Sequence, residues 1–139
     1  MSELSRPRPI PDEHSRAYWA AAAEHRLLIQ RCTACGGFQW YPRRHCTACF
    51  APDPEWHEAR GTGRLHTFSV IHRTPNAEFA GECPYVFAIV ELDEGVRVSA
   101  RIVESPHEQL VCDAPVRVVF EPGPDGVTLP SFTLDTQAR

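Results

Sequence analysis

The chain has 139 residues, which is enough for one ordinary domain and a small appendage. Its formal net charge is −4, and all fourteen basic residues are arginines, which excludes chemistry through a Schiff-base lysine. The sequence contains no signal-peptide pattern before the first cysteine and no apolar run near the roughly 18 residues of a membrane span. We therefore expect a cytoplasmic protein without membrane contact.

The first predicted unit, residues 1–25, is an arm followed by a helix. Three prolines among the first eleven residues exclude a regular helix there. A run of four alanines then favours a helix from Asp12 to about Glu24, with Asp12 or Ser15 as its cap. Tyr18 and Trp19 are its only large apolar side chains. They are expected to dock either on the residues that follow or on another protein, and the sequence leaves both open.

Four cysteines then follow in the pattern C-x2-C-x10-C-x2-C: Cys32, Cys35, Cys46 and Cys49. Each C-x-x-C pair aims two sulfurs at one point, and a short hairpin brings the two pairs together, as in structural zinc sites. Four thiolates complete a tetrahedral shell and leave no position for water, so we expect structural rather than catalytic zinc. Two redox-active or disulfide-forming pairs are the alternative interpretation.

The cysteines define the second predicted unit, a zinc ribbon over residues 26–58. So few residues bury too little apolar surface to fold alone, so zinc binding is expected to supply the folding free energy. Thiolate ligands also indicate a reducing compartment. The ribbon strands are predicted at residues 26–31, 38–41 and 55–58.

The third predicted unit, residues 59–139, consists of strands separated by turns rich in proline and glycine. Strands are predicted at residues 62–73, 85–92, 96–103, 116–120 and 131–134. Five strands without a helical pattern favour a small closed barrel such as the OB-fold, with an open β-sandwich as the alternative. The predicted fold class is therefore mainly β: an N-terminal helix, a four-cysteine zinc ribbon and a five-stranded OB-fold barrel.

A zinc ribbon joined to an OB barrel is typical of nucleic-acid-binding proteins, but the charge distribution opposes that function. Residues 1–73 carry ten arginines and seven acidic residues, whereas residues 74–139 carry four arginines and eleven acidic residues. Binding to phosphates requires local positive potential, and the barrel half lacks it. We therefore expect no nucleic-acid partner.

Two arginines in the ribbon, Arg43 and Arg44, have two interpretations. They can contact an anionic ligand, such as the phosphates of a nucleotide-bearing cofactor. The second interpretation, which we favour, is that they offset the net charge of −2 on a zinc ion held by four thiolates. No G-x-S-x-G, H-E-x-x-H, Walker or Rossmann motif is present, so no catalytic residue is predicted.

Motifs along nearly the whole chain resemble one known family. They are Tyr18-Trp19, Arg26 to Cys32, Cys35-Gly36, Tyr41-Pro42-Arg43, Cys46-x-x-Cys49, Gly61-Thr62-Gly63, Phe68-Ser69-Val70, Pro84-Tyr85, Glu91 to Gly95, Pro115-Val116 and Pro130-x-Phe132. In this order they are similar to the zinc-ribbon/OB-fold acyl-CoA-associated proteins, long catalogued as a domain of unknown function. The resemblance assigns the zinc ligands to the four cysteines and transfers no catalytic residue.

The resemblance implies a non-catalytic partner of a thiolase-superfamily enzyme that acts on acyl-CoA esters. Such a subunit helps to assemble the enzyme or to shape its CoA-ester channel, and two copies of each chain are the simplest assembly. The predicted contact residues are Tyr18 and Trp19 on the helix and Phe79 in an exposed turn between Thr74 and Pro84. A nucleic-acid-binding adaptor is the alternative, and an autonomous acyl-CoA- or lipid-binding protein is a third possibility.

Overall fold

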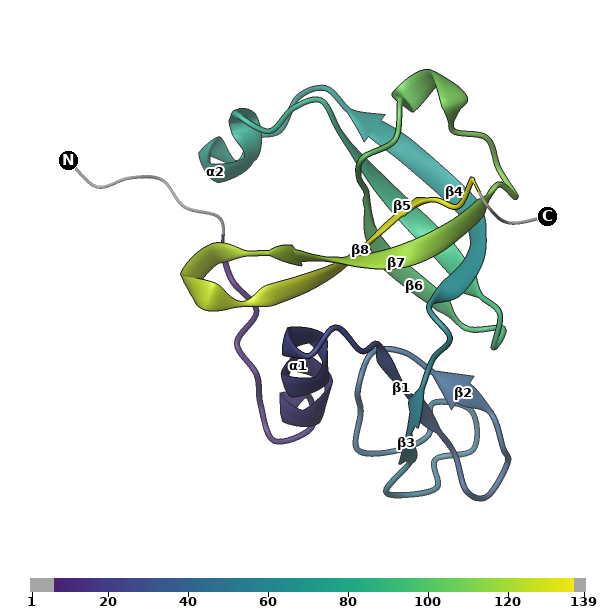
Figure 1. Cartoon of the computed structure of the whole chain (residues 1–139). Helices are drawn as coiled ribbons and strands as arrows, with labels where there is room; N and C mark the ends of the chain where they lie inside the picture. Colours follow the sequence, from purple (N-terminus) through teal and green to yellow (C-terminus); the bar gives the residue numbers. More distant parts are fainter. Residues whose placement is uncertain (1–6, 137–139) are drawn as a thin grey trace.

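The computed structural model of the chain describes residues 7–136 (Figure 1). Residues 1–6 of the predicted arm and 137–139 of the predicted barrel unit lie outside the described residues. The fold has an N-terminal helix, a small ribbon sheet and a closed barrel, so the predicted fold class is confirmed. No helix among the described residues is long and apolar enough to cross a membrane.

Helix α1 spans Arg16–Ala23 and is shorter than predicted. Asp12 lies in the turn before it, where its carboxylate accepts the backbone N–H groups of His14 and Ser15. The Ser15 hydroxyl accepts the backbone N–H of Asp12 in return, at 3.0 Å. This reciprocal arrangement satisfies amide groups at the helix start, as a capping box does. Both predicted capping residues, Asp12 and Ser15, therefore take part in this arrangement, in the turn that precedes the first helical residue, Arg16.

The ribbon is a three-stranded antiparallel sheet in the order β2-β1-β3. Its strands are β1 (Leu28–Arg31), β2 (Phe38–Gln39) and β3 (Glu55–Glu58). Each C-x-x-C pair forms a tight turn that we call a knuckle. The first knuckle, with Cys32 and Cys35, connects β1 to β2, and the second, with Cys46 and Cys49, lies between β2 and β3. The two knuckles thus lie at the same end of the sheet, where their cysteines can meet.

The barrel is closed in the strand order β4-β5-β6-β8-β7, with β4 pairing to both β5 and β7. Its strands are β4 (Thr62–Ile71), β5 (Tyr85–Leu92), β6 (Arg97–Ile102), β7 (Pro115–Pro122) and β8 (Thr128–Leu134). This order is that of the OB-fold. Because β4 and β7, the first and last strands of this order, pair with each other, the prediction of a closed barrel is confirmed and the open sandwich is wrong.

Alternation along the strands builds the core. Val86, Ala88 and Val90 on β5 are fully buried, together with Leu65 on β4 and Phe132 on β8. Side chains two residues apart lie on the same face of a strand, so these apolar residues fill the barrel interior. The barrel therefore encloses a continuous apolar core.

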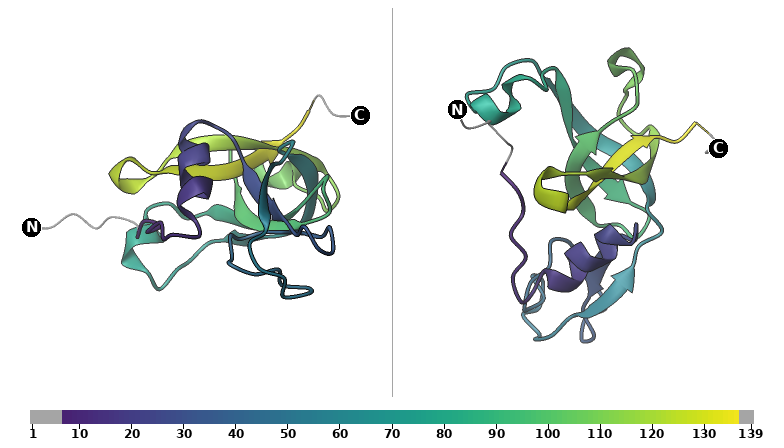
Figure 2. Two further views of the ribbon diagram at one scale, coloured as in Figure 1. Left: turned by 90° about the horizontal axis from the view of Figure 1, so that it is seen from below. Right: turned by 60° about the vertical axis from the view of Figure 1, so that its left-hand side comes forward.

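Helix α1 packs with one face against the ribbon and the barrel, while its opposite face is exposed. It contacts β1 of the ribbon and β8 of the barrel, and it lies beneath the β7–β8 hairpin in Figures 1 and 2. Tyr18 is buried at 3% exposure, and Trp19 is half-buried. Of the two alternatives that the sequence left open for this aromatic pair, Tyr18 therefore follows the first, docking within its own chain. The pair docks on the ribbon of its own chain, because Trp40 and Tyr41 provide a surface that a one-dimensional pattern does not reveal.

The segment between β4 and β5 also differs from the exposed turn that the sequence predicts. It contains a short helix, α2 (Ala77–Ala80), and Phe79 on that helix is half-buried. The Phe79 ring lies 6.3 Å from the ring of Tyr85, and the guanidinium carbon of Arg101 lies 5.7 Å from its centroid. Phe79 therefore packs on the outer surface of the barrel.

Candidate functional site

The four predicted zinc ligands converge on one point. The sulfurs of Cys32, Cys35, Cys46 and Cys49 all lie within 4.8 Å of one another. The Cys32 and Cys49 sulfurs are 3.5 Å apart, and the Cys35 and Cys46 sulfurs are 3.7 Å apart. A tetrahedral zinc ion with bonds of about 2.3 Å requires separations of about 3.8 Å between sulfurs. The cluster therefore fits zinc, and it is the only such group of ligands among residues 7–136.

The backbone of each knuckle prepares its first sulfur for the thiolate state. The N–H groups of Cys35 and Ala34 donate to the Cys32 sulfur at 3.4 Å, and they lower the pKa of that thiol to about 6. In the second knuckle the N–H groups of Cys49 and Ala48 lower the pKa of Cys46 in the same way. Metal ligation requires the thiolate, so these N–H groups prepare Cys32 and Cys46 to bind a metal.

Two buried glutamines hold the loop between the knuckles. The Gln30 side-chain amide donates to the Arg43 carbonyl oxygen at 3.0 Å, and its oxygen accepts the Arg43 backbone N–H at 2.8 Å. Gln39 donates to the oxygen of Gln30 at 2.8 Å and to the His45 carbonyl oxygen at 3.1 Å. The oxygen of Gln39 accepts the Thr47 N–H. The network connects strands β1 and β2 to the second knuckle and so fixes the distance between the cysteine pairs.

The two knuckles differ at one equivalent position. Each contains a Cys-Thr-Ala-Cys sequence, which Gly36 follows in the first copy and Phe50 in the second. Both residues have positive φ, 76° and 65°, in the left-handed region that glycine adopts most easily. Phe50 is also 76% exposed. Local conformation does not explain a phenylalanine here, which makes Phe50 a candidate contact residue.

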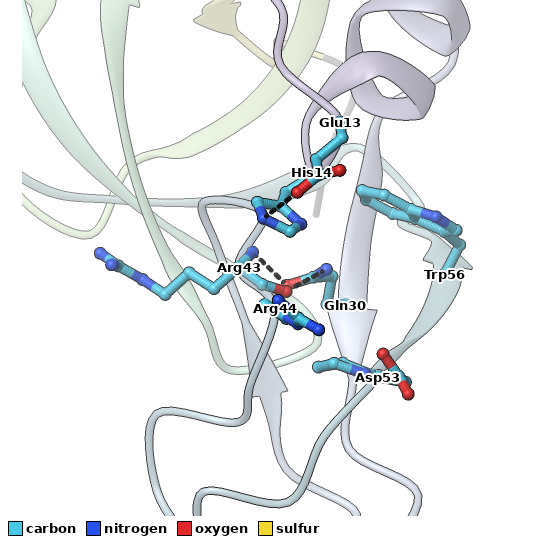
Figure 3. Close-up of a pocket in the computed structure, with 8 residues that line it drawn as sticks. Glu13, His14, Gln30, Arg43, Arg44, Asp53 and Trp56 are labelled. Atoms are coloured by element: carbon cyan, nitrogen blue, oxygen red, sulfur yellow. Dashed lines mark hydrogen bonds and ion pairs between the residues drawn. The ribbon is translucent and has the colours of Figure 1, made fainter.

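The predicted ligand residues Arg43 and Arg44 both line a polar pocket of about 400 Å³ beside the ribbon. Figure 3 shows its other labelled residues: Glu13, His14, Gln30, Asp53 and Trp56. The Arg43 side chain extends away from Trp56 and from the Arg44 guanidinium in this view. The two arginines thus provide separate positive charges rather than one clamp. Neither forms an ion pair with another residue in the described range 7–136.

The predicted contact residues Tyr18 and Trp19 meet Phe79, which is distant from them in sequence, in a second pocket of about 340 Å³. We call it the aromatic pocket; its other lining residues are Pro7, Trp40, Tyr41, Ser99, Arg101, Glu121, Pro124, Leu129, Pro130 and Ser131. The predicted contact residues are thus close together. Tyr18 is buried and packs against the ring of Trp19, so it does not itself face a partner. Sequence reasoning missed Arg101 and Glu121, since isolated charges on or beside predicted strands carry no signal. The consecutive aromatic residues Trp40 and Tyr41, which follow the first knuckle, are a sequence signal by which this pocket could have been predicted.

Comparisons with known proteins agree with this architecture. Residues 19–55 match the family described as "ChsH2, rubredoxin-like zinc ribbon domain", and residues 56–121 match "ChsH2, C-terminal OB-fold domain". A DUF35 domain-containing scaffold protein of Methanocaldococcus jannaschii is 36% identical over 116 residues, which cover 78% of this chain and 81% of the relative. The chain belongs to the DUF35 family.

Two further similarities link this DUF35 chain to enzyme subunits. A probable enoyl-CoA hydratase alpha subunit of Thermomonospora curvata is 35% identical over 127 residues. These residues cover 91% of the DUF35 chain but only 39% of that subunit. The solved structure named Ltp2-ChsH2(DUF35) aldolase has a chain that is 34% identical, with a TM-score of 0.80. That match covers 91% of the DUF35 chain and 98% of the chain in the aldolase structure.

Proposed function

We propose that this chain is a non-catalytic subunit of a thiolase-like enzyme that acts on acyl-CoA esters. In this role it stabilises the complex and helps to shape the CoA-ester channel. The observation that carries the proposal is the similarity, at a TM-score of 0.80, to a chain of the Ltp2-ChsH2(DUF35) aldolase. That match extends over 98% of the aldolase chain and 91% of this chain, so most of this fold has a counterpart in a protein named as an aldolase.

Zinc has a structural role in this proposal. Cys32 and Cys46 are buried, and all four sulfurs are directed at one another, so a zinc ion there has no open position for a substrate. The ribbon sheet has only three short strands, and one of them has two residues. The metal therefore supplies the stability that this small sheet does not provide.

The proposed contact with the partner uses two surfaces, the aromatic pocket and the second knuckle of the ribbon. Trp19 and Phe79 are half-buried at the aromatic pocket, and Phe50 is exposed at the second knuckle. Aromatic residues in such positions are common anchors of protein interfaces. Thiolase-type enzymes are commonly twofold dimers, so the proposed assembly has two copies of each chain.

Arg43 and Arg44 are the proposed contacts to the anionic part of CoA. Neither guanidinium has an ion-pair partner among residues 7–136, so both are free to meet phosphates. Offsetting the charge of the zinc-thiolate cluster remains the competing role. Replacing each arginine singly by glutamine separates the two, because a phosphate contact alters the KM for acyl-CoA and charge compensation alters zinc retention.

A hydratase partner is the second candidate, favoured by the hydratase alpha subunit of Thermomonospora curvata. In both candidates this chain contributes no catalytic group, and only the reaction of the partner differs. Residues 74–139 carry four arginines and eleven acidic residues, which disfavours the nucleic-acid adaptor.

The proposal is tested by co-expressing a tagged form of this chain with a thiolase-like enzyme or a hydratase subunit from the same organism. We expect the thiolase-like enzyme to co-purify and the chain alone to consume no acyl-CoA. Activity of the enzyme should rise when this chain is added. Co-purification of the hydratase instead supports the second candidate, and turnover by this chain alone contradicts both.

A further inference from the structure

The aromatic pocket lies where OB-folds bind their ligands. That surface is formed by the second and third barrel strands and by the loops that join strands one to two and four to five. In this chain Arg101 lies on the third barrel strand, β6, and Phe79 lies on the first of these loops. Pro124 lies on the second loop, between β7 and β8. The site is therefore at the ligand-binding position of the fold, closed on its remaining side by α1 and the ribbon.

The walls of this pocket are aromatic rings at steep angles to one another. The rings of Tyr18 and Trp19 are perpendicular at a centroid distance of 5.0 Å, and those of Trp40 and Tyr41 meet at 78° and 5.5 Å. The Trp19 indole N–H donates to the Tyr41 hydroxyl, and the Trp40 indole N–H donates to the Tyr18 hydroxyl. Hydrogen bonds within the cluster thus use both indole donors and hold the rings in place.

The charges around the pocket leave one carboxylate without a cation. Arg101 donates through Nη1 to Glu82 at 2.7 Å and stacks on the Tyr85 ring at 4.2 Å, whereas its Nη2 is buried without a hydrogen-bond acceptor among the described residues. Glu121 accepts the Ser131 hydroxyl at 2.6 Å but forms no ion pair with any residue in the described range 7–136. A half-buried carboxylate beside aromatic rings attracts a positive charge.

We infer that the aromatic pocket receives an arginine side chain of the partner subunit. Its guanidinium lies against the rings and pairs with Glu121, which combines a cation–π contact with a charge-assisted hydrogen bond. Charge complementarity supports a basic partner surface, because residues 74–139 have eleven acidic residues and four arginines. The identity of the partner rests on the proposed function, but recognition of the guanidinium is a property of this chain alone.

Titration of the zinc-loaded full chain with two small probes tests the inference. N-acetyl-arginine amide carries the guanidinium, and N-acetyl-citrulline amide is its neutral counterpart of nearly the same shape. The indole N–H signals of the three tryptophans in a ¹H–¹⁵N NMR spectrum report the location, since Trp19 and Trp40 line this pocket and Trp56 lines the polar pocket. We expect the arginine probe to shift the first two signals and the citrulline probe to bind at least about fivefold more weakly.

Glu121→Gln keeps an acceptor for Ser131 and removes the charge, so it should weaken binding of the arginine probe about fivefold. Glu108→Gln, which changes an exposed carboxylate outside the pocket, should leave binding unchanged. Equal shifts by both probes, or no shift of the Trp19 and Trp40 signals, would overturn the inference.

Binding of the partner subunit provides a second, independent test of the inference. Glu121→Gln should raise the dissociation constant of the complex about tenfold, whereas Glu108→Gln should not. If no complex forms with the wild-type chain, the proposed function fails, and the probe titration still decides whether the pocket recognises a guanidinium. If a complex forms and Glu121→Gln does not weaken it, the pocket does not receive an arginine of that partner.

Discussion

Replacing Gln30 by Met should destabilise the ribbon, because one side chain holds the loop that joins the two cysteine pairs. Gln30 is 4% exposed and takes part in three hydrogen bonds, two with the Arg43 backbone and one with Gln39. A net value of about 1 kcal/mol for each bond predicts a loss of about 3 kcal/mol.

Urea denaturation at a fixed excess of zinc, followed by circular dichroism, measures this loss as a change in midpoint at constant slope. Gln109→Met is the matched control, because Gln109 is exposed and its substitution should change the free energy of unfolding by less than about 0.5 kcal/mol. Zinc transfer to a chelator should be faster from Gln30→Met than from the control, since the loop no longer fixes the second knuckle.

The double mutant with Gln39→Met tests whether the two glutamines act as one network. The double mutant should lose less stability than the sum of the single mutants, with a coupling energy above about 0.5 kcal/mol. If Gln30→Met is as stable as Gln109→Met, or if the two substitutions are additive, the network does not hold the ribbon and the reasoning is refuted.

Three further predictions concern metal, ligand and pH. Cys32→Ser should lose zinc and unfold the ribbon, and metal analysis with circular dichroism would expose an error if a metal-free ribbon stayed folded. Single-stranded DNA and RNA should not bind at about 0.15 M salt, and submicromolar binding with a steep salt dependence would restore the adaptor interpretation. Burial raises the pKa of Tyr18 to about 12, above its value in the unfolded chain, so stability should be complete below pH of about 10 and fall by roughly 2–3 kcal/mol towards pH 12. Tyr18→Phe should flatten this alkaline decline, and an unchanged pH profile would show that the hydroxyl is accessible.

The sequence predicted the zinc cluster and the barrel because both depend on local patterns. Cysteine spacing within a knuckle fixes the direction of the sulfurs, and alternation along β5 places Val86 and Val90 in the core. Strand ends were less predictable: the last strand begins at Thr128 rather than Ser131, because pairing with β7 extends it.

Long-range contacts account for what the sequence did not reveal. Tyr18 looked exposed because its helix has few apolar neighbours, yet Trp40 and Tyr41 from the ribbon cover it. Gln30 and Gln39 looked like ordinary strand residues, and their role appears only when the loop that they hold is folded against them. Binding functions of polar side chains depend on such contacts, which no periodicity encodes.

The central claim is that this chain functions as a subunit bound to a thiolase-like enzyme. Size-exclusion chromatography with light scattering, applied to the two chains purified after co-expression, tests it most directly. We predict a single peak that contains both chains, with a mass equal to two copies of each. Separate elution of the two chains at micromolar concentration would contradict the account.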